Sequence, residues 1–128
     1  MFKFFCLAAG GALGAIARYG ISGWAHGVGP GGFPWGTLCV NAVGSLLIGA
    51  FFGMSELAPV SSATRLLVAV GFLGAFTTFS TYSLETLNLF KDKQAMLAMM
   101  NIGLNNAFSL LFVFGAYLLS RSIATSFS

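Results

Sequence analysis

Four apolar stretches, each long enough to cross the hydrocarbon core of a bilayer, account for most of the 128 residues of this chain. A membrane-spanning helix needs about 20 predominantly apolar residues, and the ranges 4–25, 35–55, 66–90 and 95–120 meet that requirement. Only 7% of the residues are charged, whereas a soluble domain carries about a quarter. We therefore expect an all-α integral membrane protein with four transmembrane helices.

The connectors between these stretches are short and leave no room for a second domain. They are a Gly/Pro-rich loop over residues 26–34, a link over 56–65 and a turn at 91–93. We predict a single transmembrane domain over residues 1–128. The apolar run after Lys3 is too long for the core of a signal peptide, so we interpret it as a spanning helix and not as a cleaved leader.

Several functional classes find no support in the composition. The six Lys and Arg residues are scattered and form no basic stripe, which argues against nucleic acid as a partner. The one histidine, His26, lies in the Gly-rich loop, and no nucleophile has a base within a recognisable spacing, so we expect no enzyme. Cys6 and Cys39 lack metal-ligand spacing and are interpreted as small buried hydrophobes.

The positive charges are balanced between the two sides of the membrane. Four spans place three cations on each side: Lys3, Arg65 and Arg121 on one, and Arg18, Lys91 and Lys93 on the other. An excess of Lys and Arg near the helix ends on one side normally sets the orientation of a chain in the membrane, and this chain has no such excess. The balance fits copies that insert both ways and pair antiparallel; a chance balance in a short protein is the alternative.

The third span contains an unusual run of hydroxyl groups. Residues 71–85 read GFLGAFTTFSTYSLE, with Ser80 and Thr81 among five Ser and Thr side chains. Such side chains bond to the backbone and loosen a helical ladder. Broken backbone is tolerated at membrane depth only inside protein or beside a water-filled cavity. We therefore predict that the third helix is interrupted near Gly74 to Thr78 and that a polar solute or ion contacts the protein there.

Polar residues at membrane depth are functional candidates because they are costly there. The amide of Asn41, in the second span, is either an interhelical clamp or an anion ligand, and its position favours neither. Asn101, Asn105 and Ser109 stand four apart on one face of the fourth span, which indicates the lining of a polar track.

Two charged residues and two aromatic rings complete the set of candidates. Arg18 is interpreted first as a snorkelling or capping cation and second as an attractor for anions. Glu85 is either a vestibule charge or the point where the helix nears the interface. Phe79 and Tyr82 stand among the hydroxyls, and the positive edge of an aromatic ring can favour a small anion.

Small residues predict how the spans pack. Gly10 and Gly14, and again Gly49 and Gly53, stand four apart, which lets helix backbones approach closely. Four helices of this length enclose little interior alone. A solute pathway is therefore expected to be completed by a second subunit.

Three segments in register resemble one known family. Residues 71–86, GFLGAFTTFSTYSLET, are similar to the Thr-Thr-Phe-Ser-Thr-Phe-Ser signature of the Fluc/CrcB fluoride channels. Residues 36–41, GTLCVN, resemble that family's Gly-Thr-Leu-x-Val-Asn, and residues 11–18, GALGAIAR, resemble its first helix. The resemblance covers essentially the whole chain in order, with four spans and a matching length.

The resemblance implies a fluoride-selective channel of a bacterial-type inner membrane that exports cytoplasmic fluoride passively and confers fluoride resistance. It implies a dual-topology antiparallel homodimer with two pores and a structural sodium ion on the two-fold axis, held by the backbone carbonyls of Gly74 and Thr77. Phe79 and Tyr82 take the places of the paired pore phenylalanines, Tyr82 differing from the family by its hydroxyl. The fluoride pathway implied in this way comprises Asn41, Phe79, Tyr82, Thr37, Ser80, Thr81, Asn105, Ser109, Glu85 and Arg18.

A small dual-topology, proton-coupled exporter is the alternative function. Such an antiporter needs a titratable carboxylate deep in a span. Glu56 and Glu85 sit at span ends and the first span has no carboxylate, which disfavours this alternative.

Overall fold

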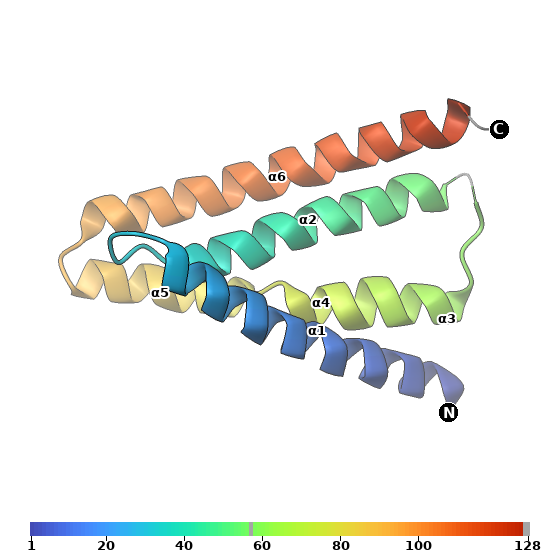
Figure 1. The fold of residues 1–128 in the computed structure, drawn as a ribbon, viewed down its shortest axis with the longest axis horizontal. Coiled ribbons are helices and arrows are strands. Elements are labelled where there is room, and N and C mark those ends of the chain that lie inside the picture. Colours follow the sequence, from blue (N-terminus) through green and yellow to red (C-terminus); the bar gives the residue numbers. More distant parts are fainter. Residues whose placement is uncertain (57, 127–128) are drawn as a thin grey trace.

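The computed structural model describes residues 1–56 and 58–126, so Leu57 of the predicted link 56–65 and the final two residues lie outside the described part. Its elements, drawn in Figure 1, are α1 (Phe2–Val28), α2 (Trp35–Ser55), α3 (Ser62–Arg65), the π-helix η1 (Leu66–Leu73), α4 (Gly74–Phe76), α5 (Phe79–Lys91) and α6 (Ala95–Ser126). Four segments are long and apolar enough to cross a membrane: Phe2–Val28, Trp35–Ser55, Ser62–Lys91 and Ala95–Ile123. The prediction of an all-α protein with four spanning helices is confirmed.

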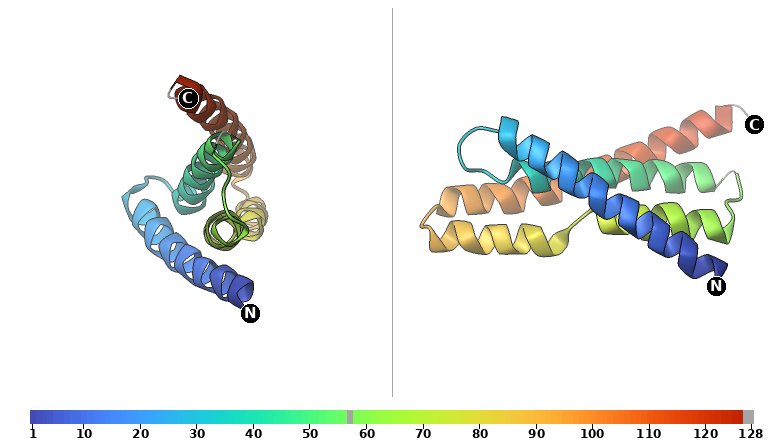
Figure 2. Two further views of the ribbon diagram at one scale, coloured as in Figure 1. Left: turned by 90° about the vertical axis from the view of Figure 1, so that its right-hand side faces the viewer. Right: turned by 60° about the horizontal axis from the view of Figure 1, so that its bottom comes forward.

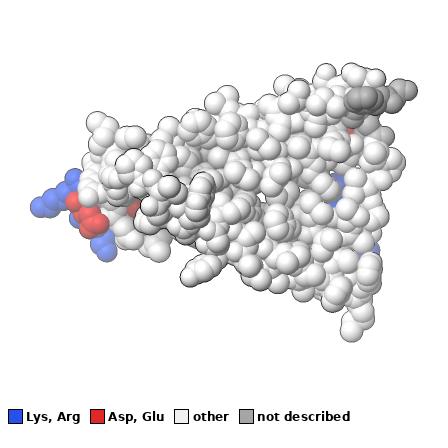
Figure 3. All heavy atoms as spheres, in the orientation of Figure 1, with Lys and Arg blue, Asp and Glu red and all other residues white. Residues whose placement is uncertain are grey.

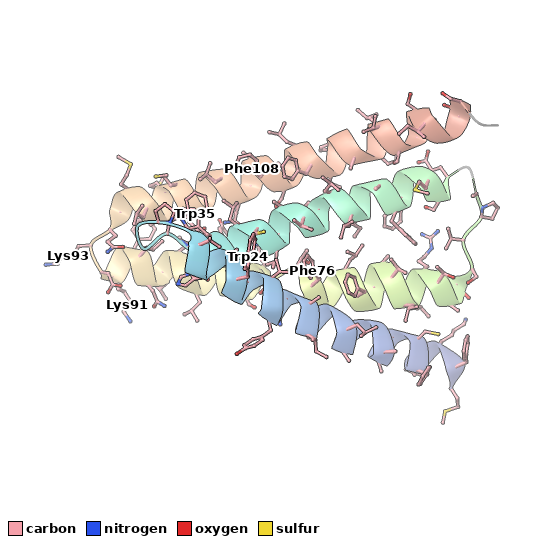
Figure 4. All side chains as sticks on the ribbon, viewed as in Figure 1. Trp24, Trp35, Phe76, Lys91, Lys93 and Phe108 are labelled. Atoms are coloured by element: carbon pink, nitrogen blue, oxygen red, sulfur yellow. The ribbon has the colours of Figure 1, made fainter. Side chains whose placement is uncertain are left out.

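The spans run alternately up and down along the long axis. Both marked chain ends and the α2–α3 connection lie at one end of the molecule (Figure 1). Lys91, the last residue of α5, and Lys93, in the α5–α6 turn, lie at the other end (Figure 4). Helix α2 packs along α6, and α1 packs along η1 and α4, so that α6 and α1 lie on different sides of the end-on view in Figure 2.

The charge distribution suits a bilayer. Figure 3 shows the Lys, Arg, Asp and Glu atoms of the visible face towards the two ends of the long axis, with an uncharged zone between them. Large apolar side chains are exposed along the spans, among them Ile16 and Leu111. In a membrane protein such side chains face lipid or another protein chain, and burial inside one chain is not required of them.

Glycines allow the helix backbones to touch. Gly14 of α1 is buried, and a Cβ there would overlap the carbonyl group of Phe72 in η1. Gly49 of α2 is also buried, and a Cβ there would overlap the carbonyl of Val113 in α6. The predicted close packing through these glycine pairs is therefore observed in the fold.

The third span is interrupted within the range predicted from its hydroxyls. Gly74 is still helical (φ −64°, ψ −35°), whereas Thr77 and Thr78 are extended (ψ 157° and 112°) and α5 begins at Phe79. The break thus occupies the last two residues of the predicted range. The π-helical stretch Leu66–Leu73 just before it was not predicted; its wider turns replace the i→i−4 ladder by i→i−5 bonds.

Candidate functional site

Asn41 of α2 holds the broken backbone of the third span. Its Oδ1 accepts a hydrogen bond from the Thr78 amide at 2.8 Å, and its Nδ2 donates to the Thr78 carbonyl at 3.2 Å. In a continuous helix the Thr78 amide would donate to the Gly74 carbonyl. A side chain from another helix has taken over that donor, which is why the chain can remain extended at membrane depth without an unpaired amide.

Thr78 also starts the helix that follows the break. It is the N-cap of α5: its Oγ1 accepts from the Thr81 amide at 3.2 Å, and its hydroxyl donates to the Thr81 Oγ1 at 2.9 Å. Ser80 Oγ lies 3.3 Å from the same Thr78 oxygen. In a continuous helix the Thr81 amide would have bonded the Thr77 carbonyl. Two backbone carbonyls, those of Gly74 and Thr77, have therefore lost their helical donors to side-chain oxygens.

A chain of amide side chains extends from Asn41 into α6 and α5. Asn41 Nδ2 donates to Asn105 Oδ1 at 3.0 Å, and Asn105 Nδ2 donates to Asn101 Oδ1 at 2.7 Å. Asn101 Nδ2 then donates to Thr86 Oγ1 at 2.9 Å. Asn105 is 5% exposed and Asn101 is fully buried. Two members of the predicted stripe on α6, Asn101 and Asn105, thus link α6 to α5 and to α2 by hydrogen bonds.

A cavity of about 350 Å³ lies beside the break, between α2, the third span and α6. Every residue that lines it is uncharged. Seven of the predicted site residues meet there: Asn41, Gly74, Thr77, Phe79, Tyr82, Asn105 and Ser109. The fold has thus gathered amides, hydroxyls and aromatic rings from three spans around one small, uncharged space.

The two predicted pore rings are neighbours. The ring centroids of Phe79 and Tyr82 are 5.3 Å apart with planes inclined by 54°. The Tyr82 hydroxyl accepts a hydrogen bond from Asn106 Nδ2 at 3.2 Å, and Asn106 Nδ2 also donates to the Ile102 carbonyl at 2.7 Å. The hydroxyl oxygen is therefore tied to α6, and its proton is left for another acceptor. Phe79 is 77% exposed in the single chain.

A second cavity, of about 570 Å³, lies on the other side of Thr78 between α1, α2 and α5. Thr78 lines both cavities and so stands between them. The predicted residues around the second cavity are Arg18, Thr37, Thr81 and Glu85. Together with His26, which also lines it, they form a charged vestibule next to an uncharged inner cavity.

Glu85 is more enclosed than a residue at a span end was expected to be. Its Oε1 accepts a hydrogen bond from the Thr37 hydroxyl at 2.7 Å. Its Oε2 is buried, and within the described part of the chain it has no hydrogen-bond partner. Glu85 therefore lines the vestibule with a carboxyl group, and its hydrogen bond to Thr37 links α5 to α2.

Sequence reasoning missed three residues of this site. Ser45 lines the inner cavity one helical turn after Asn41, and that spacing of four would have identified it. Asn106 lies outside the stripe of residues four apart, yet it lines the same cavity as its neighbour Asn105. Thr86 ends the amide chain, and its spacing of four from Tyr82 marks the same face of α5.

The chemistry of the site is that of neutral ligands. Amide N–H and hydroxyl groups can solvate an anion, and freed backbone carbonyls can coordinate a cation. The described residues contain no group of three or more His, Cys, Asp or Glu side chains that could hold a metal ion. The inner cavity is thus suited to an ion that is bound weakly enough to leave again.

Comparisons with known proteins agree along the length of the chain. The family model described as CrcB-like protein, Camphor Resistance (CrcB), matches residues 5–117. The fluoride-specific ion channel FluC of Idiomarina loihiensis is 41% identical over 119 residues, which are 93% of this chain and 92% of that protein. The protein of the same name from Parabacteroides distasonis is 37% identical over 125 residues, 98% of each chain. That of Thermus thermophilus is 51% identical over 87 residues, 68% of each chain.

Proposed function

This chain belongs to the CrcB family, and we propose that it is a fluoride-selective channel through which fluoride leaves the cytoplasm passively. It is a multi-pass protein of the plasma membrane. Its relatives carry the name of an ion channel and not of an enzyme. The observation that carries the proposal is 41% identity over 93% of the chain with a protein named as a fluoride-specific channel.

The geometry of the inner cavity supports passage of a small anion. The hydroxyl groups of Ser109 and Tyr82 line it as neutral donors, whereas the N–H groups of Asn41, Asn105 and Asn106 already bond protein acceptors and hold the lining in place. A fixed Lys or Arg would hold an anion tightly, whereas conduction requires binding that is weak enough for release. Arg18 lines the vestibule, where a positive charge raises the local concentration of anions without binding them tightly in the inner cavity.

Passive export is sufficient for fluoride resistance. In acidic surroundings fluoride enters a cell as neutral HF, which ionises in the more alkaline cytoplasm. A selective leak then lets the trapped anion out down its gradient, with no energy coupling. Resistance is thus expected from the channel activity alone.

We also propose a structural sodium ion at the break. The carbonyls of Gly74 and Thr77, freed of their helical amide donors by Asn41 and Thr78, are hard, uncharged oxygen ligands of the type that suits sodium. Gly74 is exposed in the single chain, so its backbone is accessible to a ligand shared with another copy. Two copies related by a two-fold axis would supply four such carbonyls.

An antiparallel homodimer would account for two features of the single chain, the exposed residues beside the break and the balanced positive charges. Gly74 and Phe79 flank the break and are exposed at the middle of a spanning segment, where the freed Gly74 carbonyl would face lipid. Open backbone is not tolerated against lipid, so a partner chain is needed to cover it. The balanced positive charges supply copies of both orientations.

Fluoride release from liposomes tests the function. We expect purified protein in liposomes loaded with both halides to release fluoride and retain chloride once a potassium ionophore relieves the membrane potential. No proton gradient should be required. Release that depends on an imposed proton gradient would support the proton-coupled exporter, for which Glu85 is the acidic side chain lining a cavity. Absence of release under both conditions would contradict the channel.

Tyr82 tests whether a ring edge or a hydroxyl contacts the ion. We expect Tyr82→Phe to keep fluoride flux within about twofold, because the ring edge survives and the lost partner is the neutral Asn106 amide. Tyr82→Ile removes the edge and should reduce flux by about tenfold, the upper range for an aromatic contact. Both variants are measured side by side in liposomes. A Phe variant as slow as the Ile variant would show that the hydroxyl is the ligand.

A further inference from the structure

Four consecutive hydrogen bonds run in one direction from the break into the interior of the protein. The Thr78 amide donates to Asn41, which donates to Asn105. Asn105 donates to Asn101, and Asn101 donates to Thr86. Each amide side chain accepts at its oxygen and donates from its nitrogen, so the orientation of one amide determines that of the next.

Within this series of hydrogen bonds, Asn101 determines how the Asn105 amide is oriented. It is fully buried, and within the described part of the protein the inner cavity is lined by Asn105 and not by Asn101. Its orientation is set from outside the cavity: the Thr86 hydroxyl donates its own proton to the Tyr82 carbonyl at 2.8 Å, so the Thr86 oxygen is an acceptor for Asn101 Nδ2. Asn101 Oδ1 must then face Asn105.

We propose that Asn101 is a positioning residue for ion passage, acting through Asn105 to hold the Asn41 amide with Nδ2 towards α6 and Oδ1 towards the Thr78 amide. The inference rests on the proposed channel function, since Asn41 matters for passage only if an ion crosses the inner cavity. Among the described residues, Asn101 does not itself line that cavity and has no hydrogen bond to the break; it reaches the lining through Asn105.

Asn41 is held in this orientation by three hydrogen bonds, two to the backbone of Thr78 and one to Asn105. A flipped Asn41 would set its nitrogen against the Thr78 amide and its oxygen against the Thr78 carbonyl and Asn105 Oδ1, so a fixed Asn105 adds one of three repulsive contacts. Without the Asn101 side chain, Asn105 keeps only its bond to the Asn101 carbonyl at 3.2 Å and can turn its amide. The low dielectric of the interior makes such polar mismatches costly.

The test uses three substitutions. Asn101→Leu removes the amide at similar volume, Thr86→Val removes the terminal acceptor at nearly the same shape, and Thr86→Ser keeps the hydroxyl as the matched control. We expect the Leu and Val variants to lower fluoride release from liposomes about tenfold, the factor that corresponds to one hydrogen bond in an equilibrium constant. The Ser variant should stay close to the parent.

A second readout separates positioning from general packing. Amide hydrogen exchange at Thr78, followed by NMR on the solubilised protein, should accelerate about tenfold in the Leu and Val variants, because the acceptor at Asn41 becomes mobile. A residue that only packed α5 against α6 would accelerate exchange near the substitution and leave Thr78 unchanged. This readout does not depend on fluoride.

Each outcome decides the proposal. Faster Thr78 exchange together with reduced flux supports it, and a change in only one of the two overturns it, as does no change in either. If Asn101→Leu does not fold, the Thr86→Val and Thr86→Ser pair carries the same comparison. If the parent protein itself releases no fluoride, the channel function fails, while Thr78 exchange still reports whether Asn101 fixes Asn41.

Discussion

Replacing Asn41 with Asp is expected to reduce fluoride release at least about 100-fold while the protein remains folded. The carboxylate has the size of the amide but only accepts hydrogen bonds. It would therefore face two oxygens that the amide now bonds, Asn105 Oδ1 at 3.0 Å and the Thr78 carbonyl at 3.2 Å. Two lost bonds with their acceptors left unpaired correspond to about two orders of magnitude. The new negative charge, beside a cavity whose lining is otherwise uncharged, also repels the permeating anion.

Asn88→Asp is the matched control for Asn41→Asp. It makes the same chemical change at an exposed position of α5, so flux should remain near that of the parent. Size-exclusion chromatography of both variants reports whether assembly is kept. If Asn41→Asp conducts within about threefold of the parent, Asn41 is a clamp for the break and makes no contact with the ion.

Fixing the orientation of the chain is expected to abolish fluoride resistance completely. Ser122→Lys with Ser126→Lys adds two cations to exposed positions near the end of α6, at the end of the molecule that holds both marked termini. Lys residues near helix ends are retained on the cytoplasmic side, so all copies should insert alike. An antiparallel pair could then no longer form. Growth of a fluoride-sensitive bacterial host on fluoride plates measures the loss.

Coexpression provides the rescue. Asn88→Lys with Gln94→Lys biases a second copy the opposite way, again at exposed positions. Neither biased copy should protect the host alone, and the two together should restore resistance. Full protection by one biased copy would contradict the antiparallel dimer and leave the channel proposal standing.

The sequence was sufficient for the spans and for the position of the break. Length and apolarity determine where a helix can cross a bilayer. The predicted range 35–55 accordingly coincides with α2, and the range 95–120 lies within α6. The break was predictable because Ser and Thr side chains, which bond to nearby backbone, gather in the middle of an apolar span. The structure adds that Thr78 is the N-cap of the helix after the break.

The network around the break was not predictable in the same way. The sequence showed Asn41 and Asn105 as polar residues on separate helices, but the choice between clamp and ligand depends on which atoms face each other. That requires the packing of α2 on α6, which Gly49 permits by close contact with Val113. The π-helical turns of η1 likewise have no local signature in Leu66–Leu73, an apolar run without proline.

The uncharged lining of the inner cavity has a consequence for regulation. Amide, hydroxyl and phenyl groups neither gain nor lose a proton over the physiological range, in contrast to His or carboxylate side chains. His26 and Glu85 line the vestibule, on the other side of Thr78. The inner cavity is therefore lined by no group whose charge follows pH in this range, so we expect the proposed channel to conduct at acidic as well as at neutral pH. We expect the proposed protection to be constitutive, available at the onset of stress and before any signal has been sensed.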